Sequence, residues 1–225
     1  MKKIAVILCG CGSLDGSEIH EAVLTLLSID KLNMSYQCFA INSQQSRVMN
    51  FIDKKPCGEI RNQFVESARI ARSNIKELNL ANAEILVEEF DALVFPGGIG
   101  LAFNLCDFAQ KGVNARVQPE IKTLIESFHA KTKPIGFICI SPALAALVLG
   151  KSSKTKVIIT AGDINDPCVD KFRDLGCIVE ACAANDCIID HKNKIISTPA
   201  YMNAKKISEV AEGIDKTLQA IYNFL

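Results

Sequence analysis

The stretch that decides the fold is Pro134-Ile-Gly-Phe-Ile-Cys-Ile-Ser-Pro142. Its apolar part, up to Ile138, has the length and composition of a buried β-strand. Ser141 is a good N-cap and Pro142 suits the first position of a helix, so a helix is expected to follow at once. Cys139 is therefore expected in a tight turn between a strand and a helix.

Working outward, short β-branched runs alternate with longer helical patterns along the chain, as in a parallel sheet with helices on both faces. The expected strands are Lys3 to Leu8, Tyr36 to Ile41, Ala92 to Phe95, Pro134 to Ile138, Lys156 to Thr160, Ile178 to Cys182, Cys187 to Asp190 and Lys194 to Ser197. Some of the last three are expected to form an antiparallel edge. The expected helices after the first are Asn62 to Ser73, Ala81 to Glu89, Glu120 to Ala130, Pro142 to Leu149, Asp166 to Leu175 and Asn203 to Phe224.

No linker, composition break or internal repeat divides the chain, so residues 1–225 are expected to form a single α/β domain. The expected irregular insertion is Asn42 to Glu59. The first helix is expected to start at Asp15 or Ser17, which are both good N-caps. Its apolar residues at i, i+3, i+4, i+7 and i+8 are expected to face the sheet: Ile19, Ala22, Val23, Leu26 and Leu27. This periodicity places Glu21 on the solvated side.

The composition argues against several classes of partner. The 225 residues are 49% hydrophobic and 22% charged, which is typical of a globular protein. Charges balance at 25 basic and 25 acidic residues, aromatics make up 6% and Trp is absent, so neither nucleic acid nor a charged membrane is expected to bind. No segment has the roughly 18 apolar residues of a membrane span, and the apolar run after Lys3 is shorter than an export signal requires, so a cytoplasmic protein is expected.

Ten cysteines are present, and without an export signal they are expected to be reduced thiols. No Cys-x-x-Cys occurs, and the histidines lie far apart in the sequence, at positions 20, 129 and 191. A metal site is therefore not expected.

Ligands of open parallel sheets bind beyond the carboxyl ends of the strands, where residues 9–17, 95–100 and 136–142 are expected to lie. At Cys139, the helix N-terminus and free backbone amides are suited to stabilising a thiolate and an oxyanion. The pKa of the thiol is expected to fall from about 8.5 into the range of about 3.5 to 7.5. The alternative is that Cys139 is a small buried apolar residue.

The segments at residues 95–100 and 9–17 can each be interpreted in two ways. The glycines of Pro96-Gly-Gly-Ile-Gly100 either bring the backbone close to a ligand or simply end a strand. Gly10-Cys-Gly-Ser-Leu-Asp-Gly16 differs from the dinucleotide fingerprint in its third glycine, and no acidic residue ends the second strand, so NAD is not expected. Glu18 and Glu21 either stabilise the helix dipole or exchange protons with a neighbouring thiol.

Together these motifs resemble the ElbB family. The resemblance covers nearly the whole chain, on Cys9 to Gly12, Asp15 to Leu27, Arg61-Asn62, Ala68 to Ile70, Pro96 to Gly98, Asn104-Leu105, Gly136 to Ile140 and Thr198 to Met202. ElbB proteins are similar to the PfpI-like branch of the class I glutamine amidotransferase superfamily. The resemblance implies a flavodoxin-like, doubly wound, mainly parallel sheet with a cysteine on a nucleophile elbow.

The resemblance also implies site residues. Cys139 would be the nucleophile, and Glu21 would reach it and donate a hydrogen bond, in place of the solvated position that periodicity gives it. Glu18 is a second carboxyl for proton transfer. Substrate or oxyanion binding would fall to Gly97, Gly98 and Ile140.

The implied activity is a glutathione-independent glyoxalase, which converts methylglyoxal or glyoxal into a 2-hydroxy acid with no cofactor. Ile140 and Thr198-Pro-Ala200 stand where amidotransferases and many PfpI-like proteases have a histidine, so a slow glyoxalase is expected rather than a glutaminase or a protease. His20, beside Glu21, stays open as a base. The expected partners are a small aldehyde and a second copy of the chain, as a homodimer. The alternatives are a non-catalytic stress protein that senses oxidants through Cys139, and a metabolite-binding subunit.

Overall fold

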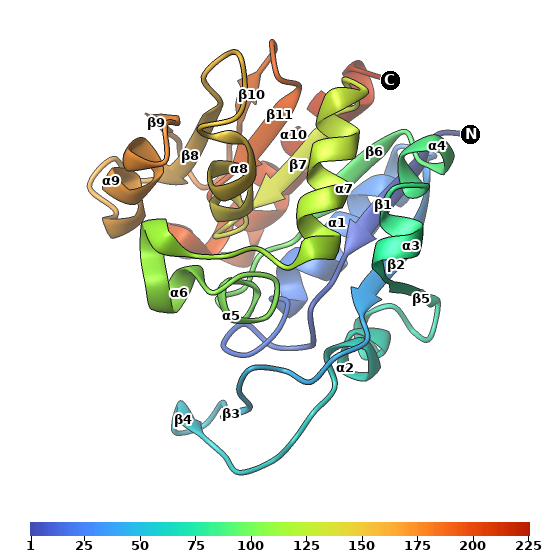
Figure 1. Cartoon of the computed structure of the whole chain (residues 1–225), viewed down its shortest axis with the longest axis vertical. Helices are drawn as coiled ribbons and strands as arrows, with labels where there is room; N and C mark the ends of the chain where they lie inside the picture. Colours follow the sequence, from blue (N-terminus) through green and yellow to red (C-terminus); the bar gives the residue numbers. More distant parts are fainter.

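The structure, a computed structural model, describes residues 1–225 as a central sheet between two layers of helices (Figure 1). The seven strands follow the order β10-β11-β7-β6-β1-β2-β5, and all neighbours are parallel except β10, which runs antiparallel to β11. Their bounds are β1 (Lys3–Ile7), β2 (Ser35–Ile41), β5 (Ile75–Leu78), β6 (Ala92–Phe95), β7 (Ile135–Ile138), β10 (Ile188–Asp190) and β11 (Ile195–Thr198). The expected single-domain, flavodoxin-like α/β fold and its antiparallel edge are confirmed.

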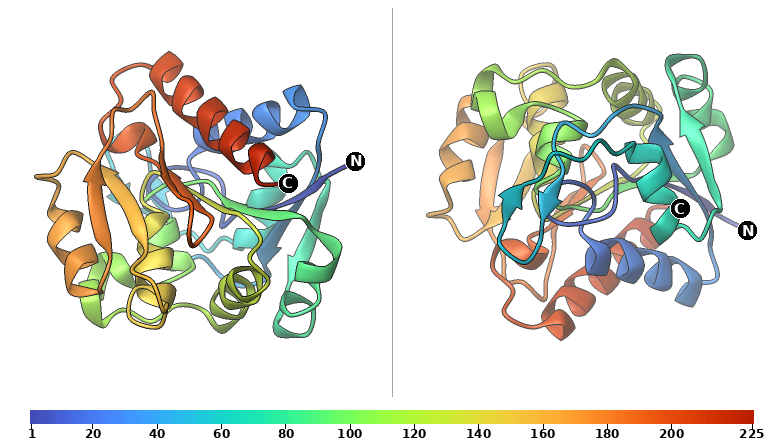
Figure 2. Two further views of the ribbon diagram at one scale, coloured as in Figure 1. Left: turned by 90° about the horizontal axis from the view of Figure 1, so that it is seen from above. Right: turned by 90° about the horizontal axis from the view of Figure 1, so that it is seen from below.

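Alternate residues of β1, an inner strand of the sheet, and Leu8 directly after it belong to two separate hydrophobic cores. Ala5 and Ile7 belong to one core cluster, whereas Ile4, Val6 and Leu8 belong to the other. Strands that are covered on both faces read as continuous apolar runs, which explains the sequence of β1. Figure 2 shows the two covering layers, with α1 and α10 together on one face and α7 and α8 on the other.

Ten α-helices and two short 3-10 helices complete the fold. The longer ones are α1 (Ile19–Lys31), α2 (Gln63–Ile70), α7 (Pro119–Ala130), α8 (Pro142–Leu149), α9 (Pro167–Asp174) and α10 (Ile207–Asn223). The short ones are α3 (Leu80–Ala83), α4 (Leu86–Glu89), α5 (Leu101–Asn104), α6 (Phe108–Lys111), η1 (Gly112–Asn114) and η2 (Ala200–Met202). The helix expected over Ala81 to Glu89 is therefore split in two, while α8 has the expected bounds. None of the helices combines the length and the apolar composition that a membrane span requires.

Two expected strands do not join the main sheet. β8 (Ile158–Gly162) and β9 (Ile178–Ala181) form a parallel pair of their own. Side chains replace part of the backbone pairing between β8 and the main sheet, because Asp190 Oδ2 accepts from Ile158 N at 2.9 Å and Ser197 Oγ accepts from Thr160 N at 3.0 Å. Conversely, the edge strand β5 was not expected from its sequence.

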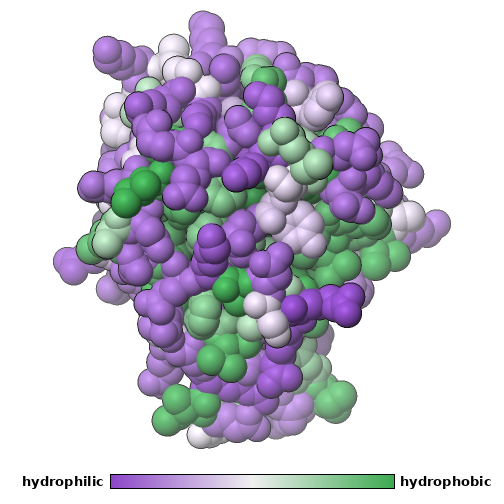
Figure 3. Space-filling view, turned by 90° about the vertical axis from the view of Figure 1, so that its right-hand side faces the viewer, coloured by the Kyte–Doolittle hydropathy of each residue, from purple (hydrophilic) through white to green (hydrophobic).

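The insertion at Asn42 to Glu59 contains a short antiparallel hairpin of β3 (Met49–Asn50) and β4 (Lys55–Pro56), which projects from the body at the bottom of Figure 1. Apolar side chains are also exposed elsewhere. Figure 3 shows them interspersed with polar ones over the face at the right of Figure 1.

The first helix is rotated from the expected orientation. Ile19, Val23 and Leu27 are 43%, 47% and 44% exposed, so the prediction that they face the sheet is wrong. Polar residues occupy part of the buried face of α1, because they form hydrogen bonds there. For example, Thr25 Oγ1 donates to the Glu21 carbonyl at 2.7 Å. Periodicity of apolar residues alone does not detect such a face.

The N-cap of α1 is also different from the expected one. Glu18 caps the helix, with its Oε2 accepting from Glu21 N at 2.7 Å. The two expected caps bind other segments, since Asp15 Oδ2 accepts from Met49 N and Ser17 Oγ accepts from Cys9 N. Both side chains thereby fix the loop between β1 and α1.

Candidate active site

Cys139 lies in the turn between β7 and α8 with a φ of 61°. This left-handed conformation is uncommon for a residue other than glycine and stores strain, which clusters at functional sites. The turn is held by two sets of bonds. Cys139 N donates to Thr198 O at 2.9 Å, and Ser141 Oγ accepts from Ile138 N at 2.6 Å while lying 2.9 Å from Phe95 O.

Ser141 has a different role from the expected one. It occupies the N-cap position of α8 but makes no side-chain cap hydrogen bond, because its hydroxyl holds the turn instead. Pro142 starts the helix as expected.

The glycines after β6 allow the backbone of this loop to lie directly against Cys139 and Glu21. A Cβ added to Gly97 would lie 2.4 Å from Cys139 Cβ and 2.5 Å from Glu21 Oε2, so no larger residue fits. The amides of Gly98 and Ile140 hydrogen-bond to the Cys139 thiol, where they are placed to stabilise negative charge. Gly97 N donates instead to Glu21 Oε2 at 3.0 Å.

Glu21 is fully buried beside the cysteine, so the solvated position given by periodicity is wrong. Its Oε2 accepts from Gly97 N, its Oε1 accepts from Tyr201 N at 3.3 Å, and its carboxyl is in hydrogen-bonding contact with the Cys139 thiol. Burial, and then the charge of Glu18, raise the pKa of Glu21 to about 8. The side chain is therefore protonated at neutral pH and has a proton to exchange.

The pKa of Cys139 is raised well above its ordinary value, by burial first and then by the Glu21 carboxylate. The amides of Gly98 and Ile140 lower the pKa of Cys139, but by less than burial and Glu21 raise it. The expected lowering of this pKa is therefore wrong, because the helix start is desolvated together with the sulfur. Cys139 depends on a neighbouring base for its ionisation.

We expect Glu21→Gln to move the pH midpoint of Cys139 alkylation downward, because the Glu21 carboxylate, a like charge beside the thiolate, is removed. The measurement is iodoacetamide labelling across a pH series, read on the peptide that contains Cys139. Glu18→Gln is the matched control, because the carboxylate that raises the pKa of Cys139 is that of Glu21, whereas Glu18 raises the pKa values of Glu21 and Tyr201. An unchanged or higher midpoint in Glu21→Gln would contradict this electrostatic account.

The other candidate side chains surround this pair. Glu18 is half-buried, caps α1 and raises the pKa values of Glu21 and Tyr201. His20 is exposed and lies 2.7 Å from the Tyr201 hydroxyl through its Nδ1. Sequence reasoning assigned no role to Tyr201, although the residue lies in the Thr198 to Met202 stretch that carries the family resemblance and follows a strand that ends at this edge of the sheet.

Two of the three expected crevice segments interlock tightly. Glu18 N donates to Gly97 O at 2.9 Å, and Gly100 N donates to Ser13 O at 3.2 Å. A Cβ added to Gly100 would lie 1.9 Å from Gly16 N. The loop after β1 therefore lies directly against the loop after β6.

Gly100→Ala is expected to destabilise the protein by about 3 kcal/mol, because the added methyl overlaps backbone that has no room to move. Urea unfolding monitored by circular dichroism would measure the change. Gly58→Ala is the matched control, since a Cβ there meets nothing within 4 Å. Equal stability of the two variants would show that the loops are not interlocked.

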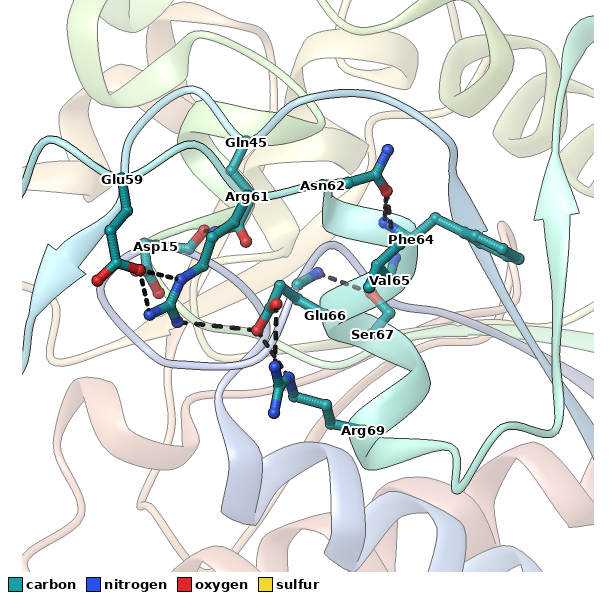
Figure 4. Close-up of polar contacts among 11 residues, drawn as sticks. Asp15, Gln45, Glu59, Arg61, Asn62, Phe64, Val65, Glu66, Ser67 and Arg69 are labelled. Atoms are coloured by element: carbon teal, nitrogen blue, oxygen red, sulfur yellow. Dashed lines mark hydrogen bonds and ion pairs between the residues drawn. The ribbon is translucent and has the colours of Figure 1, made fainter.

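The motif residues at the start of α2 fasten this helix to the same loop (Figure 4). Glu66 lies between two arginines: its Oε2 is 3.8 Å from Arg61 Nη1 and 2.9 Å from Arg69 Nε. Asn62 Oδ1 caps the helix by accepting from the next two free amides, and Ser67 Oγ accepts from Gly10 N at 2.7 Å. These contacts support the loop rather than add a reactive group.

Solved structures of a DJ-1 superfamily protein from Salmonella typhimurium and of a ThiJ/PfpI domain protein from Brachyspira murdochii share this fold, at 19% and 12% identity and with TM-scores of 0.52 and 0.58. No protein-family model matches the chain.

Two curated relatives match almost the full length. The chain is 35% identical over 231 residues to the human glutamine amidotransferase-like class 1 domain-containing protein 3, mitochondrial, covering 97% of this chain and 82% of the relative. It is 34% identical over 229 residues to the rat ES1 protein homolog, mitochondrial, with the same coverage. The chain belongs to this family of glutamine amidotransferase-like class 1 domain proteins, which includes the ES1 proteins.

Solved structures agree on the fold. An Ehrlichia chaffeensis protein, described as an isoprenoid biosynthesis protein with amidotransferase-like domain, superposes with a TM-score of 0.89 at 38% identity, covering 99% of this chain and all of that one. Glyoxalase III from Candida albicans superposes with a TM-score of 0.60 at 13% identity, covering 98% of this chain and 97% of that one. At that identity the likeness to the glyoxalase extends to the fold alone.

Proposed function

We propose that this protein converts methylglyoxal or glyoxal into a 2-hydroxy acid without glutathione, as its resemblance to the ElbB family implies. The observation that carries the proposal is the buried carboxyl of Glu21, with a pKa of about 8, in contact with the Cys139 thiol. An acid–base group whose pKa lies near the working pH gives and takes protons most effectively.

The first step is addition of sulfur to the aldehyde. The carboxylate form of Glu21, which is the minor form at neutral pH because the pKa is about 8, takes the thiol proton. The Cys139 sulfur forms a bond to the aldehyde carbon, and the carbonyl electron pair moves to oxygen. The amides of Gly98 and Ile140 stabilise the oxyanion until Glu21 returns the proton to it. The product is a hemithioacetal, and Glu21 is again a carboxylate.

The second step moves hydrogen along the carbon skeleton. Glu21 removes the remaining hydrogen of the former aldehyde carbon as a proton, which gives an enediolate. It then protonates the neighbouring carbon, while the hydroxyl proton on the former aldehyde carbon passes to the oxygen on the neighbouring carbon. The former aldehyde carbon becomes a thioester carbonyl, and water releases the acid and the free thiol. One carbon is oxidised and its neighbour is reduced, so the overall reaction needs no external oxidant or reductant.

The redox-sensing alternative is less well supported. Oxidation by peroxide requires a thiolate, and burial beside Glu21 raises the pKa of Cys139. Nucleophilic catalysis tolerates the raised pKa because a base lies next to the thiol. Membership of ElbB within the wider family, the aldehyde partner, the homodimer and the cytoplasmic location remain predictions.

The test of the proposed function is incubation of the purified protein with methylglyoxal, in buffer free of glutathione, with product detection by carbon-13 NMR. We expect lactate to accumulate steadily, over many equivalents of enzyme. Heat-denatured protein is the control, because free thiols and amines also consume methylglyoxal. Loss of methylglyoxal without lactate from the native protein would rule the proposal out.

A further inference from the structure

Tyr201 and His20 form a hydrogen-bonded pair near Glu21, which accepts a hydrogen bond from the Tyr201 amide. His20 Nδ1 lies 2.7 Å from the Tyr201 hydroxyl oxygen, and the two ring centroids are 5.8 Å apart. His20 belongs to the first turn of α1, next to Glu21, whereas Tyr201 follows β11 in η2. An exposed imidazole thus holds a half-buried phenol at the edge of the candidate active site.

The backbone before Tyr201 is shaped to reach Glu21. Ala200 is fully buried with a φ of 45°, a conformation that residues other than glycine rarely adopt. It is followed by the Tyr201 amide, which donates to Glu21 Oε1 at 3.3 Å. Cys139, at the end of the neighbouring strand β7, has the same kind of backbone. Two strained residues at adjacent strand ends therefore place groups on one carboxyl, as expected of a functional site.

The phenol is kept in its protonated form. Burial raises the pKa of Tyr201, and the carboxylates of Glu18 and Glu21 raise it further. The hydroxyl is therefore a hydrogen-bond donor over the whole physiological range. The residues from the end of β11 up to Tyr201 are Thr198, Pro199 and Ala200, which carry no ionisable side chain. Tyr201 is therefore the first side chain at this strand end that can exchange a proton.

The proposed reaction needs a second acid–base group. Isomerisation of the hemithioacetal moves one proton between two carbons and another between two oxygens. Glu21 serves the carbons, while the groups of Gly98 and Ile140 that contact the sulfur are backbone amides, which stabilise charge without exchanging protons at a useful rate.

Resting on the proposed function, we propose that Tyr201 is a catalytic residue that transfers the proton between the two substrate oxygens, and that His20 is its positioning residue. When Glu21 takes the proton from the first carbon, the C–H electron pair forms the carbon–carbon double bond and Tyr201 protonates the oxygen on the second carbon. Glu21 then protonates the second carbon. The hydroxyl on the first carbon returns a proton to the Tyr201 oxygen and becomes the thioester carbonyl.

Tyr201→Phe tests the inference, because it keeps the ring and the amide that binds Glu21 and removes only the hydroxyl. We expect kcat for methylglyoxal to fall about a hundredfold. We also expect the methylglyoxal concentration that half-protects Cys139 from iodoacetamide to rise about tenfold, since the adduct loses one hydrogen bond. The alkylation rate without aldehyde should stay unchanged. Tyr222→Phe, at an exposed tyrosine of α10, is the matched control and should change none of these.

His20→Ala should lower kcat less than Tyr201→Phe does, and the double variant should be no slower than Tyr201→Phe, because His20 acts through the hydroxyl. Unchanged protection in Tyr201→Phe would overturn the inference, whether or not the wild type makes lactate. An altered alkylation rate without aldehyde would also overturn it, since the hydroxyl would then be structural. Weaker protection together with no lactate from the wild type would support the Tyr201 contact and refute the proposed function.

Discussion

Cys139→Ser is expected to lower kcat for methylglyoxal by at least about a thousandfold. The seryl hydroxyl is a far weaker acid than the thiol, so Glu21, with a pKa of about 8, is too weak a base to ionise it. The hydroxyl has the shape of the thiol and is smaller, so it fits in the same space, and the left-handed turn with its bonds to Thr198 and Ser141 is expected to persist. Lactate formation by the two proteins, measured at equal concentration, gives the comparison.

Cys182→Ser is the matched control for that experiment, because Cys182 is another partly buried cysteine, in the segment after β9. It should retain wild-type activity. If Cys139→Ser still produced lactate at a tenth of the wild-type rate or faster, Cys139 would not be the nucleophile. The reaction would then have to be assigned to other side chains.

Glu21→Gln is expected to make the protein more stable than the wild type above pH 8. The pKa of Glu21 is about 8 in the folded protein and 4.5 ordinarily, so the folded state binds the proton more tightly than the unfolded chain does. Between these values unfolding releases a proton, and the wild type loses stability as pH rises. Above pH 8 the loss is complete and is on the order of 5 kcal/mol. Below pH 4.5 it vanishes.

Urea unfolding of both proteins at pH 4, 6 and 8 would measure this difference. The stability of Glu21→Gln minus that of the wild type should grow with pH across the series. Glu59→Gln is the control, at an exposed surface carboxylate. A difference that stayed constant with pH would mean that the folded protein does not hold Glu21 in its protonated form.

The sequence determined the parts of the fold that depend on local signals. The start of α8 was predicted correctly because Pro142 and the apolar strand before it lie within a few residues of one another. β5 was missed because half of its four residues are charged, and its pairing with β2 is a long-range contact. The strand over Lys156 to Thr160 was expected in the main sheet, but side chains of Asp190 and Ser197 intervene.

The candidate site shows the same division. Cys139 was found from its local turn, whereas the burial of Glu21 depends on partners 76 and 180 residues away in the chain. A resemblance to known proteins supplied that position, which apolar periodicity had placed on the wrong side. The raised pKa of Cys139 also escaped prediction, since the desolvation that causes it comes from the whole tertiary structure.

The crossing of the two loops at Gly16 and Gly100 limits how this protein can evolve. Backbone atoms of the two loops are in direct contact there, so neither position tolerates a side chain. New substrate preferences would have to arise through neighbouring side chains that are free to vary, such as Ile99, which is 45% exposed. Descendants with altered chemistry should therefore keep both glycines and differ at the residues around them.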